Sequence, residues 1–97
     1  MFSIEELNHK NVDLCFELDL STISLWSKKQ WKDEFKKPGI KVLGLFVFTQ
    51  IVGICVNQFV LDEVQINYFS IKEKFRRSGH GTRLISYLIK HCEDSGI

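Results

Sequence analysis

Twenty consecutive residues from Val42 to Leu61, VLGLFVFTQIVGICVNQFVL, carry no charged side chain. A stretch of this length could cross a bilayer as a helix. However, Thr49 and Gln50 interrupt it halfway, and it is rich in Val, Ile and Phe, which favour strands. We therefore predict two buried strands, at about 41–48 and 51–60, joined by a tight turn at Thr49–Gln50. A membrane helix is the less favoured interpretation.

The sequence before this hairpin predicts a short strand at 2–6 and then two helices. Residues 11–20 carry apolar side chains at roughly helical spacing, with Asn11 as the expected N-cap. The second helix is expected to begin after Ser24 or Ser27, to run to about Lys36, to bury Trp31 and Phe35, and to end at Pro38-Gly39.

The sequence after the hairpin predicts one more strand, at 63–71, and one more helix, at about 80–94. In the strand EVQINYFSI, alternation places one set of side chains (Val64, Ile66, Tyr68) on one face and the other set (Gln65, Asn67, Phe69) on the opposite face. An apolar stripe marks the helix, formed by Leu84, Ile85, Leu88, Ile89 and Cys92. Gly96 is expected to stop this helix. The predicted order, β-α-α-β-β-β-α over a single domain 1–97, is an α+β chain with a mostly antiparallel sheet.

Charge and cysteine content exclude several classes of protein. Thirteen Lys and Arg against twelve Asp and Glu give a net charge of +1, which argues against a nucleic-acid binder. The cysteines (Cys15, Cys55 and Cys92) are far apart and form no CxxC pair, so we expect core residues and no metal site. Unpaired thiols and the absence of a signal-peptide pattern suit a cytoplasmic protein.

A basic, glycine-containing segment, KFRRSGHGTRL at 74–84, separates the last strand from the last helix. Gly79 and Gly81 remove side chains where the helix begins, and the free N–H groups of a first helical turn attract phosphate. Further phosphate partners are expected from Lys74, Arg76, Arg77, Arg83 and the hydroxyl of Thr82. The segment matches neither the GxxxxGK[ST] nor the GxGxxG pattern. The alternative is that both glycines only shape a turn.

The run RRSGHG at 76–81 resembles the R/Q-x-x-G-x-G/A loop of the GCN5-related N-acetyltransferase (GNAT) family. In that family the loop amides bind the pyrophosphate of acetyl-CoA, and the preceding strand holds the pantetheine arm through its backbone. The resemblance therefore implies acetyl-CoA as acetyl donor, without a metal. The implied cofactor-binding residues are Phe69, Ser70, Ile71, Arg76, Arg77, Ser78, Gly79, His80, Gly81 and Thr82. His80 is expected to belong to the phosphate cradle, with acid–base work as the alternative.

Two further segments, LWS at 25–27 and VLDEVQINYFSI at 60–71, are similar to the bacterial ribosomal-protein-alanine N-acetyltransferases. This resemblance implies direct acetyl transfer to the N-terminal alanine amine of a small-subunit ribosomal protein, with no nucleic acid or membrane as partner. It also implies that the catalytic base and acid lie beyond Ile97. On this resemblance the chain is an N-terminal portion, truncated before the C-terminal strands, and is inactive or impaired alone.

Several alternatives remain open from the sequence. A non-catalytic CoA-binding or interaction module is one, and self-association through an exposed edge of 63–71 is another. Asp62 or Glu63 could act as a base, although a turn or capping role is favoured. Tyr68 could donate a proton, although packing is favoured. The lysines of 28–37 form either a solvated face or a contact surface for the acceptor.

Overall fold

The computed structural model describes residues 2–94. The elements are β1 (Phe2–Leu7), η1 (His9–Asn11), α1 (Val12–Leu20), α2 (Lys28–Phe35), β2 (Ile40–Val47), β3 (Gln50–Val60), β4 (Glu63–Ile71), η2 (Glu73–Phe75) and α3 (His80–Asp94), where η denotes a 3-10 turn. The predicted element order and the α+β class are confirmed. The predicted stop at Gly96 lies outside the described residues.

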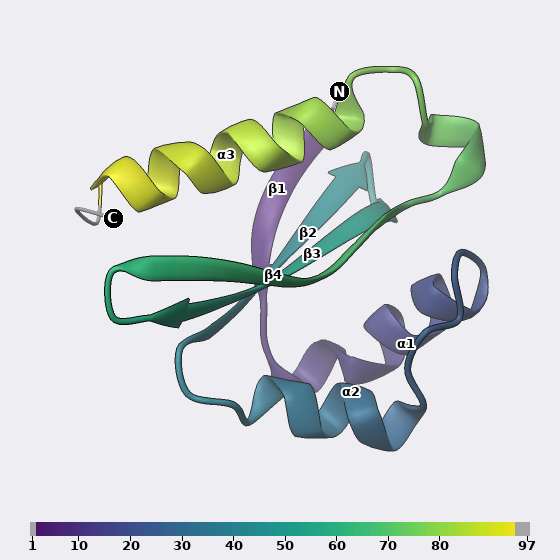
Figure 1. Cartoon of the computed structure of the whole chain (residues 1–97). Helices are drawn as coiled ribbons and strands as arrows, with labels where there is room; N and C mark the ends of the chain where they lie inside the picture. The colour runs from purple at the N-terminus through teal and green to yellow at the C-terminus, as the bar shows by residue number, and fades with distance from the viewer. Residues whose placement is uncertain (1, 95–97) are drawn as a thin grey trace.

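The four strands form one antiparallel sheet in the order β1-β2-β3-β4 (Figure 1). The helices α1 and α2 cover one face, and α3 lies across the other. The charge-free stretch becomes β2 and β3, as predicted, because both strands are buried on both faces between these helices. Over residues 2–94, no helix is long and apolar enough to cross a membrane.

The turn between β2 and β3 differs from the prediction by one residue. Val47 pairs with Gln50, so the turn consists of Phe48 and Thr49, and Gln50 belongs to β3. Phe48 is 79% exposed and adopts a left-handed backbone with φ 55°. A two-residue hairpin turn needs positive φ, and here a bulky residue takes a conformation that suits Asn or Gly.

Each face of the sheet has its own hydrophobic core. The core beneath α1 and α2 contains Leu7, Val12, Cys15, Leu18, Trp31, Val42, Ile51, Ile54, Val56 and Tyr68. The core beneath α3 contains Leu43, Leu45, Val52, Cys55, Ile71, Leu84, Leu88 and Cys92. All three cysteines are therefore buried and free, as expected, and burial raises the pKa of Cys15 to about 12. The stripe of α3 is narrower than predicted, because Ile89 is exposed.

A β-bulge in β4 overturns the simple alternation predicted for 63–71. Val56 pairs with Tyr68, but the next residue, Asn57, pairs with Ile66, so Asn67 is left over. One extra residue reverses which face the following side chains meet. Val64 consequently packs against the α3 core while Tyr68 packs into the α1/α2 core, although we predicted that they would share a face.

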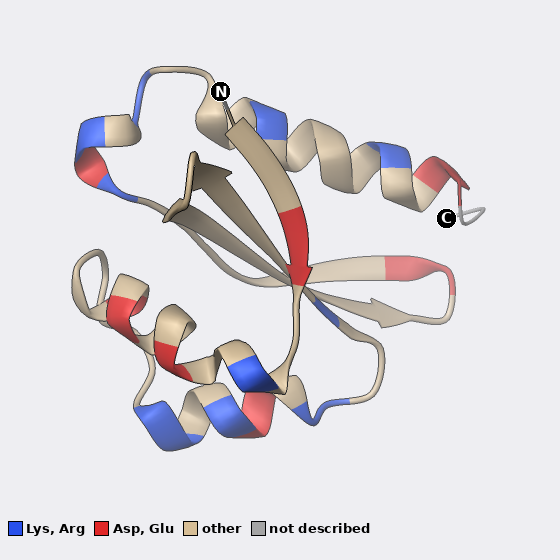
Figure 2. Cartoon of the chain, turned by 180° about the vertical axis from the view of Figure 1, so that it is seen from behind, with Lys and Arg blue, Asp and Glu red and all other residues tan. Residues whose placement is uncertain are grey.

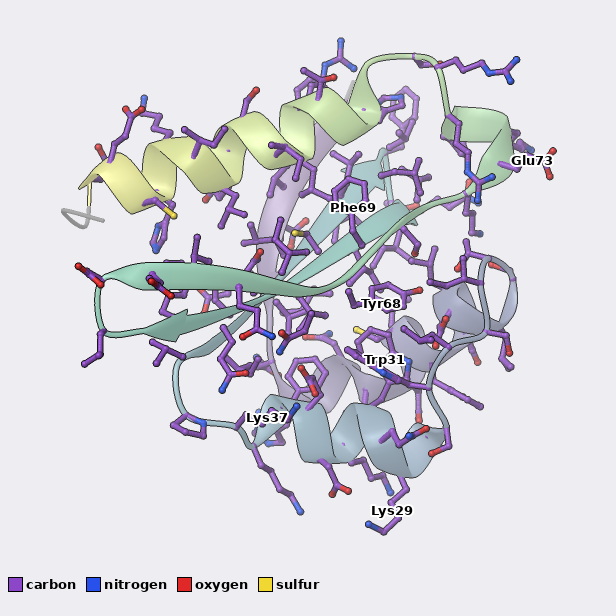
Figure 3. The ribbon with its side chains drawn as sticks, viewed as in Figure 1. Lys29, Trp31, Lys37, Tyr68, Phe69 and Glu73 are labelled. Carbon is purple, nitrogen blue, oxygen red and sulfur yellow. The ribbon has the colours of Figure 1, made fainter. Side chains whose placement is uncertain are left out.

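Tyr68 and Phe69, which both follow the bulge, lie on opposite faces as predicted, and Phe69 shares the α3 side with Val64. Figure 3 shows Tyr68 pointing toward Trp31 and Phe69 pointing toward α3. The extra residue is anchored, since the Asn67 amide donates to Glu34 Oε2 of α2 at 2.7 Å and to Gln58 Oε1 at 3.1 Å.

Of the two helix N-caps predicted from the sequence, only the one for α2 is confirmed as a hydrogen-bonded cap. The expected cap, Asn11, makes no capping bond to α1. Instead Asn8 caps η1, where its side chain accepts from the backbone N–H of Lys10 at 2.9 Å. The Ser27 cap of α2 is confirmed, with a reciprocal bond between Ser27 and Gln30.

Asp19, at the end of α1, is a fully buried carboxylate that joins three parts of the chain. Its Oδ1 accepts from the backbone N–H of Leu25 at 2.9 Å and from the Tyr68 hydroxyl at 3.0 Å. Its Oδ2 accepts from the backbone N–H of Trp26 at 2.9 Å and from Trp31 Nε1 at 3.0 Å. The aromatic rings of Trp26, Trp31 and Tyr68 pack against one another with centroids 4.8–5.2 Å apart.

Two opposing effects set the pKa of Asp19. Burial raises this pKa, because a charged carboxylate loses hydration. The hydrogen bonds from Leu25, Trp26, Trp31 and Tyr68 favour the charged form and outweigh burial, so the pKa lies below the usual value of 3.8. The carboxylate is therefore charged in the folded protein at neutral pH.

We predict that Phe48→Asn raises the free energy of unfolding by about 1 kcal/mol, because Asn tolerates the left-handed backbone that Phe adopts at a cost. The exposed Phe48 ring gives up little burial. Urea denaturation measures the change, and Thr49→Asn, at the other turn residue, is the control with an expected change near zero. A variant no more stable than wild type would contradict this reading of the turn.

We predict that Asp19→Asn lowers the free energy of unfolding by about 3 kcal/mol, because an amide cannot accept from all four donors and leaves buried N–H groups unpaired. Asp13→Asn, which removes an exposed carboxylate, is the matched control and should cost less than about 1 kcal/mol. Chemical denaturation at pH 7 gives both values. An equal loss in the two variants would contradict the central role of Asp19.

The lowered pKa of Asp19 also predicts how the stability of the protein changes as the pH falls. Because its folded pKa lies below its unfolded pKa, the stabilisation is complete above the unfolded value of about 3.9 and is lost as pH falls through the folded pKa. Denaturation midpoints from pH 6 to 2 should therefore fall more steeply for wild type than for Asp19→Asn. If the midpoints of the two proteins fell in parallel, groups other than Asp19 would determine the loss of stability at acid pH.

Candidate functional site

The ten residues predicted to bind the cofactor lie along one continuous path. Three of them, Phe69, Ser70 and Ile71, form the end of β4, and the other seven follow η2 as a loop and the first turn of α3. Figure 1 shows this path at the end of the sheet where β4 leaves toward α3. Within the described residues β4 pairs only with β3, so its other edge presents unpaired backbone groups.

The loop before α3 is held by one side-chain hydrogen bond and by its backbone conformation. Arg76 Nε donates to the carbonyl of Ile71 at 2.9 Å, which ties the loop to the end of β4. Arg77 and Gly79 adopt left-handed backbones, with φ 65° and 78°. The backbone N–H of Arg83 donates to the carbonyl of Gly79 at 3.0 Å and closes the first turn of α3. Gly79 is thus required by its conformation, since L side chains rarely adopt this φ.

Backbone N–H groups gather where the loop becomes the helix. Among the described residues, those of 77–82 have no protein acceptor, whereas the next one, on Arg83, is paired. A helix of fifteen residues adds partial positive charge at this end. Unpaired donors and a helix dipole at one place suit an anion with several acceptor oxygens.

Gly81 has no packing reason to be glycine. A Cβ added there would lie 3.6 Å from the Phe69 ring, which is an ordinary contact, and its backbone φ is not left-handed. Alanine would also favour the helix. A glycine at a helical position that has room for a methyl group is consistent with close approach of a ligand to the backbone.

The cationic side chains around the loop form no ion pair with any carboxylate that the structure describes. Within residues 2–94, no carboxylate lies within 4.0 Å of the charged groups of Lys74, Arg76, Arg77 or Arg83. Arg83 lies over the Phe2 ring at 4.4 Å, and its Nη1 is 3.2 Å from His80 Nδ1. This contact differs from the expectation that Arg83 would be free for phosphate.

His80 is half-buried beside two aromatic rings. Its ring centroid lies 6.4 Å from that of Phe2 and 6.1 Å from that of Phe75, in edge-to-face geometry. Arg83 Nη1 can only donate, so His80 Nδ1 is the acceptor in this contact. This packing favours a role in shaping the loop over acid–base work.

A small hollow of about 240 Å³ joins the end of β4 to the loop between α1 and α2. It is lined by Ile23, Phe69, Ser70, Ile71 and Arg76. Sequence reasoning missed Ile23, which is one of three apolar residues in the connection between α1 and α2, with Leu25 and Trp26.

Ser70 reaches this hollow from the buried side. Tyr68 donates its only hydroxyl proton to Asp19, so Ser70 Oγ, 2.8 Å from the Tyr68 oxygen, is the donor in that contact. Burial raises the pKa of Tyr68 to about 12, with a further increase from Asp19. Tyr68 is thus a buried hydrogen-bonding residue, as favoured from the sequence, and not a free proton donor.

Two other candidates lie away from this hollow. Asp62 lies in the turn before β4 and Glu63 is the first residue of β4, at the opposite end of the strand from Ile71. That distance along the strand favours the turn role over the role of base. In the part of the chain described, no cluster of His, Cys, Asp or Glu could hold a metal ion.

Comparison with known proteins gives a family match. The sequence model of the acetyltransferase (GNAT) family matches residues 8–97. Among curated protein sequences, none matches the chain significantly.

Several solved structures share the fold. The ribosomal-protein-S18-alanine N-acetyltransferase from Escherichia coli has a TM-score of 0.91 at 20% identity, over 100% of this chain and 63% of that one. The ribosomal-protein-alanine N-acetyltransferase from Brucella melitensis has a TM-score of 0.81 at 18% identity, over 97% and 73%. PaiA N-acetyltransferase from Thermoplasma acidophilum, solved with coenzyme A, has a TM-score of 0.80 at 14% identity, over 100% and 75%.

These likenesses agree with the strand, loop and helix described above. At 14–20% identity they show the fold, and the chain spans 63% of the length of the Escherichia coli enzyme. The family match covers nearly the whole chain and includes the glycine loop. The chain therefore belongs to the GNAT acetyltransferase family.

Proposed function

We propose that the chain binds acetyl-CoA and serves the transfer of its acetyl group to a protein N-terminal amine. The observation that carries the proposal is the run of unpaired backbone N–H groups at 77–82, in the loop and first turn of α3 that follow the open edge of β4 and η2. A pyrophosphate needs clustered donors, and an extended amide-containing arm needs a strand edge. The family match supports the same assignment.

The residues divide into two groups in this proposal. The backbone groups of Phe69, Ser70 and Ile71 pair with the pantetheine arm, and one N–H polarises the thioester carbonyl. The phosphate end is held by Arg76, Arg77, Ser78, Gly79, His80, Gly81 and Thr82. Acetyl-CoA supplies an activated acyl group, so an amine can attack it directly without a covalent enzyme intermediate.

The acceptor we propose is the N-terminal alanine of a small-subunit ribosomal protein. Its support is the likeness to two ribosomal-protein-alanine N-acetyltransferases. Tyr68, which contacts Ser70 of the small hollow, and Asp19, which accepts from Tyr68, are both engaged in buried hydrogen bonds. The proposal therefore assigns cofactor binding to this chain and assigns no catalytic acid or base.

We expect acetyl-CoA to stabilise the folded chain by mass action, by about 2.7 kcal/mol at 100 times the Kd. Thermal unfolding measures the shift, and acetyl-pantetheine, which lacks the phosphates, should shift it far less. Transfer is then tested with an alanine-starting peptide against its N-acetylated form, by mass spectrometry. No shift with acetyl-CoA would overturn the proposal, and a shift without transfer would restrict it to cofactor binding.

We predict that Gly81→Ala weakens CoA binding without weakening the fold. A methyl group fits beside Phe69 in the free protein, and Ala should raise helix stability by up to about 1 kcal/mol. It would, however, separate the loop amides from the phosphate, which we expect to lower affinity roughly ten- to hundredfold. Calorimetric titration and urea denaturation measure the two effects.

The matched control is Ser86→Ala, an exposed position one turn further along α3. It should improve the helix slightly and leave CoA affinity unchanged. Equal affinity in Gly81→Ala and wild type would show that the glycine serves the turn and not the ligand.

A further inference from the structure

A basic hollow of about 580 Å³ lies between η1, the start of α1, and α2. None of the proposed cofactor-binding residues lines it. Four lysines surround it, one from η1, two from α2 and one from the residue that caps the end of α2, namely Lys10, Lys28, Lys32 and Lys36. Its apolar lining comes from Val12, which is buried, and Phe35, which is half-buried.

The lysines of this basic hollow are poorly neutralised. Lys28, Lys32 and the C-cap residue Lys36 are spaced by four residues, so they form one stripe along α2 and its end, where like charges are destabilising. Asp13 pairs with Lys28 at 2.6 Å, and this hydrogen bond, with the charge of Lys28, lowers the pKa of Asp13. Within residues 2–94, no carboxylate lies within 4.0 Å of the ammonium groups of Lys32 or Lys36.

An acidic surface, opposite in charge to the basic hollow, lies at the β3–β4 turn. Leu61 is 96% exposed and adopts a left-handed backbone with φ 56°, and Asp62 and Glu63 beside it are exposed. Val60 before them is half exposed. These four residues, the hairpin tip, thus present two apolar side chains followed by two carboxylates, and neither carboxylate has an ion-pair partner among the described residues.

The hairpin tip and the basic hollow cannot meet within one molecule as it is folded. Figure 2 shows the acidic tip at the far end of the β3–β4 hairpin and the basic positions along α2, on separate parts of the surface. A second copy can bring them together. Apolar side chains next to two carboxylates match an apolar floor next to lysines, both in charge and in polarity.

We propose that two copies of this chain associate by docking the hairpin tip of one, Val60–Glu63, into the basic hollow of the other. Nucleic acid fits the hollow less well, because the net charge is only +1 and the floor is apolar. A hairpin tip buries less than the roughly 800 Å² per partner of a standard interface, so the association is weak. It is also sensitive to salt.

Sedimentation velocity at concentrations up to about 1 mM tests the proposal by charge reversal. Wild type should associate at low salt and dissociate at about 0.5 M salt. Lys32→Glu/Lys36→Glu and Asp62→Lys/Glu63→Lys should each weaken self-association at least about tenfold, by loss of about two charge pairs. Mixing the two variants should restore association. The acidic hollow of Lys32→Glu/Lys36→Glu can then bind the basic hairpin tip of Asp62→Lys/Glu63→Lys.

Leu61→Ser tests the apolar contact and should also weaken association, while Lys90→Glu, an exposed change on α3, should not. Circular dichroism of each variant confirms folding. A wild-type monomer at every concentration would overturn the proposal. Association that survives both charge reversals would also overturn it, and would point to pairing through the open edge of β4.

Discussion

The buried carboxylate of Asp19 holds together the part of the fold that frames the acyl end of the proposed site. Its two oxygens accept four hydrogen bonds, from the α1–α2 connection, from α2 and from β4. A buried charge is tolerated only when it is fully bonded, so each of these segments is confined to one position relative to α1. The same bonds fix Tyr68, which orients Ser70, and they fix the connection that carries Ile23.

The proposed cofactor site uses mainly backbone. The loop N–H groups, the open edge of β4 and the glycine at Gly81 all expose main-chain atoms, while the adjacent cations have no acidic partner in residues 2–94. Backbone donors have no rotamer freedom to lose on binding, so the site is organised before a ligand arrives. This arrangement explains why a short motif in the sequence can indicate a binding site at all.

Sequence reasoning succeeded where a pattern has one structural outcome. The polar break and the Val, Ile and Phe content of the charge-free run favoured two buried strands over a membrane helix, although the turn lies one residue earlier than predicted. The glycine loop could be recognised from RRSGHG. Sequence reasoning failed at Asn67, because a bulge leaves no mark in an alternating sequence and yet moves Tyr68 and Val64 to opposite faces. It also missed Asp19, although that carboxylate follows Cys15 by four residues and so lies on the buried face of α1.

The sequence alone determined the element order, the hairpin, and the position of a basic glycine loop at a helix start, because each depends on neighbouring residues. Tertiary structure alone decided the bulge register, the bonding of Asp19 and the separation of the hairpin tip from the basic hollow. These depend on groups far apart in the chain, such as Asn67 with Glu34 and Asp19 with Tyr68. Local propensity carries no information about such pairs, since packing between the layers selects them.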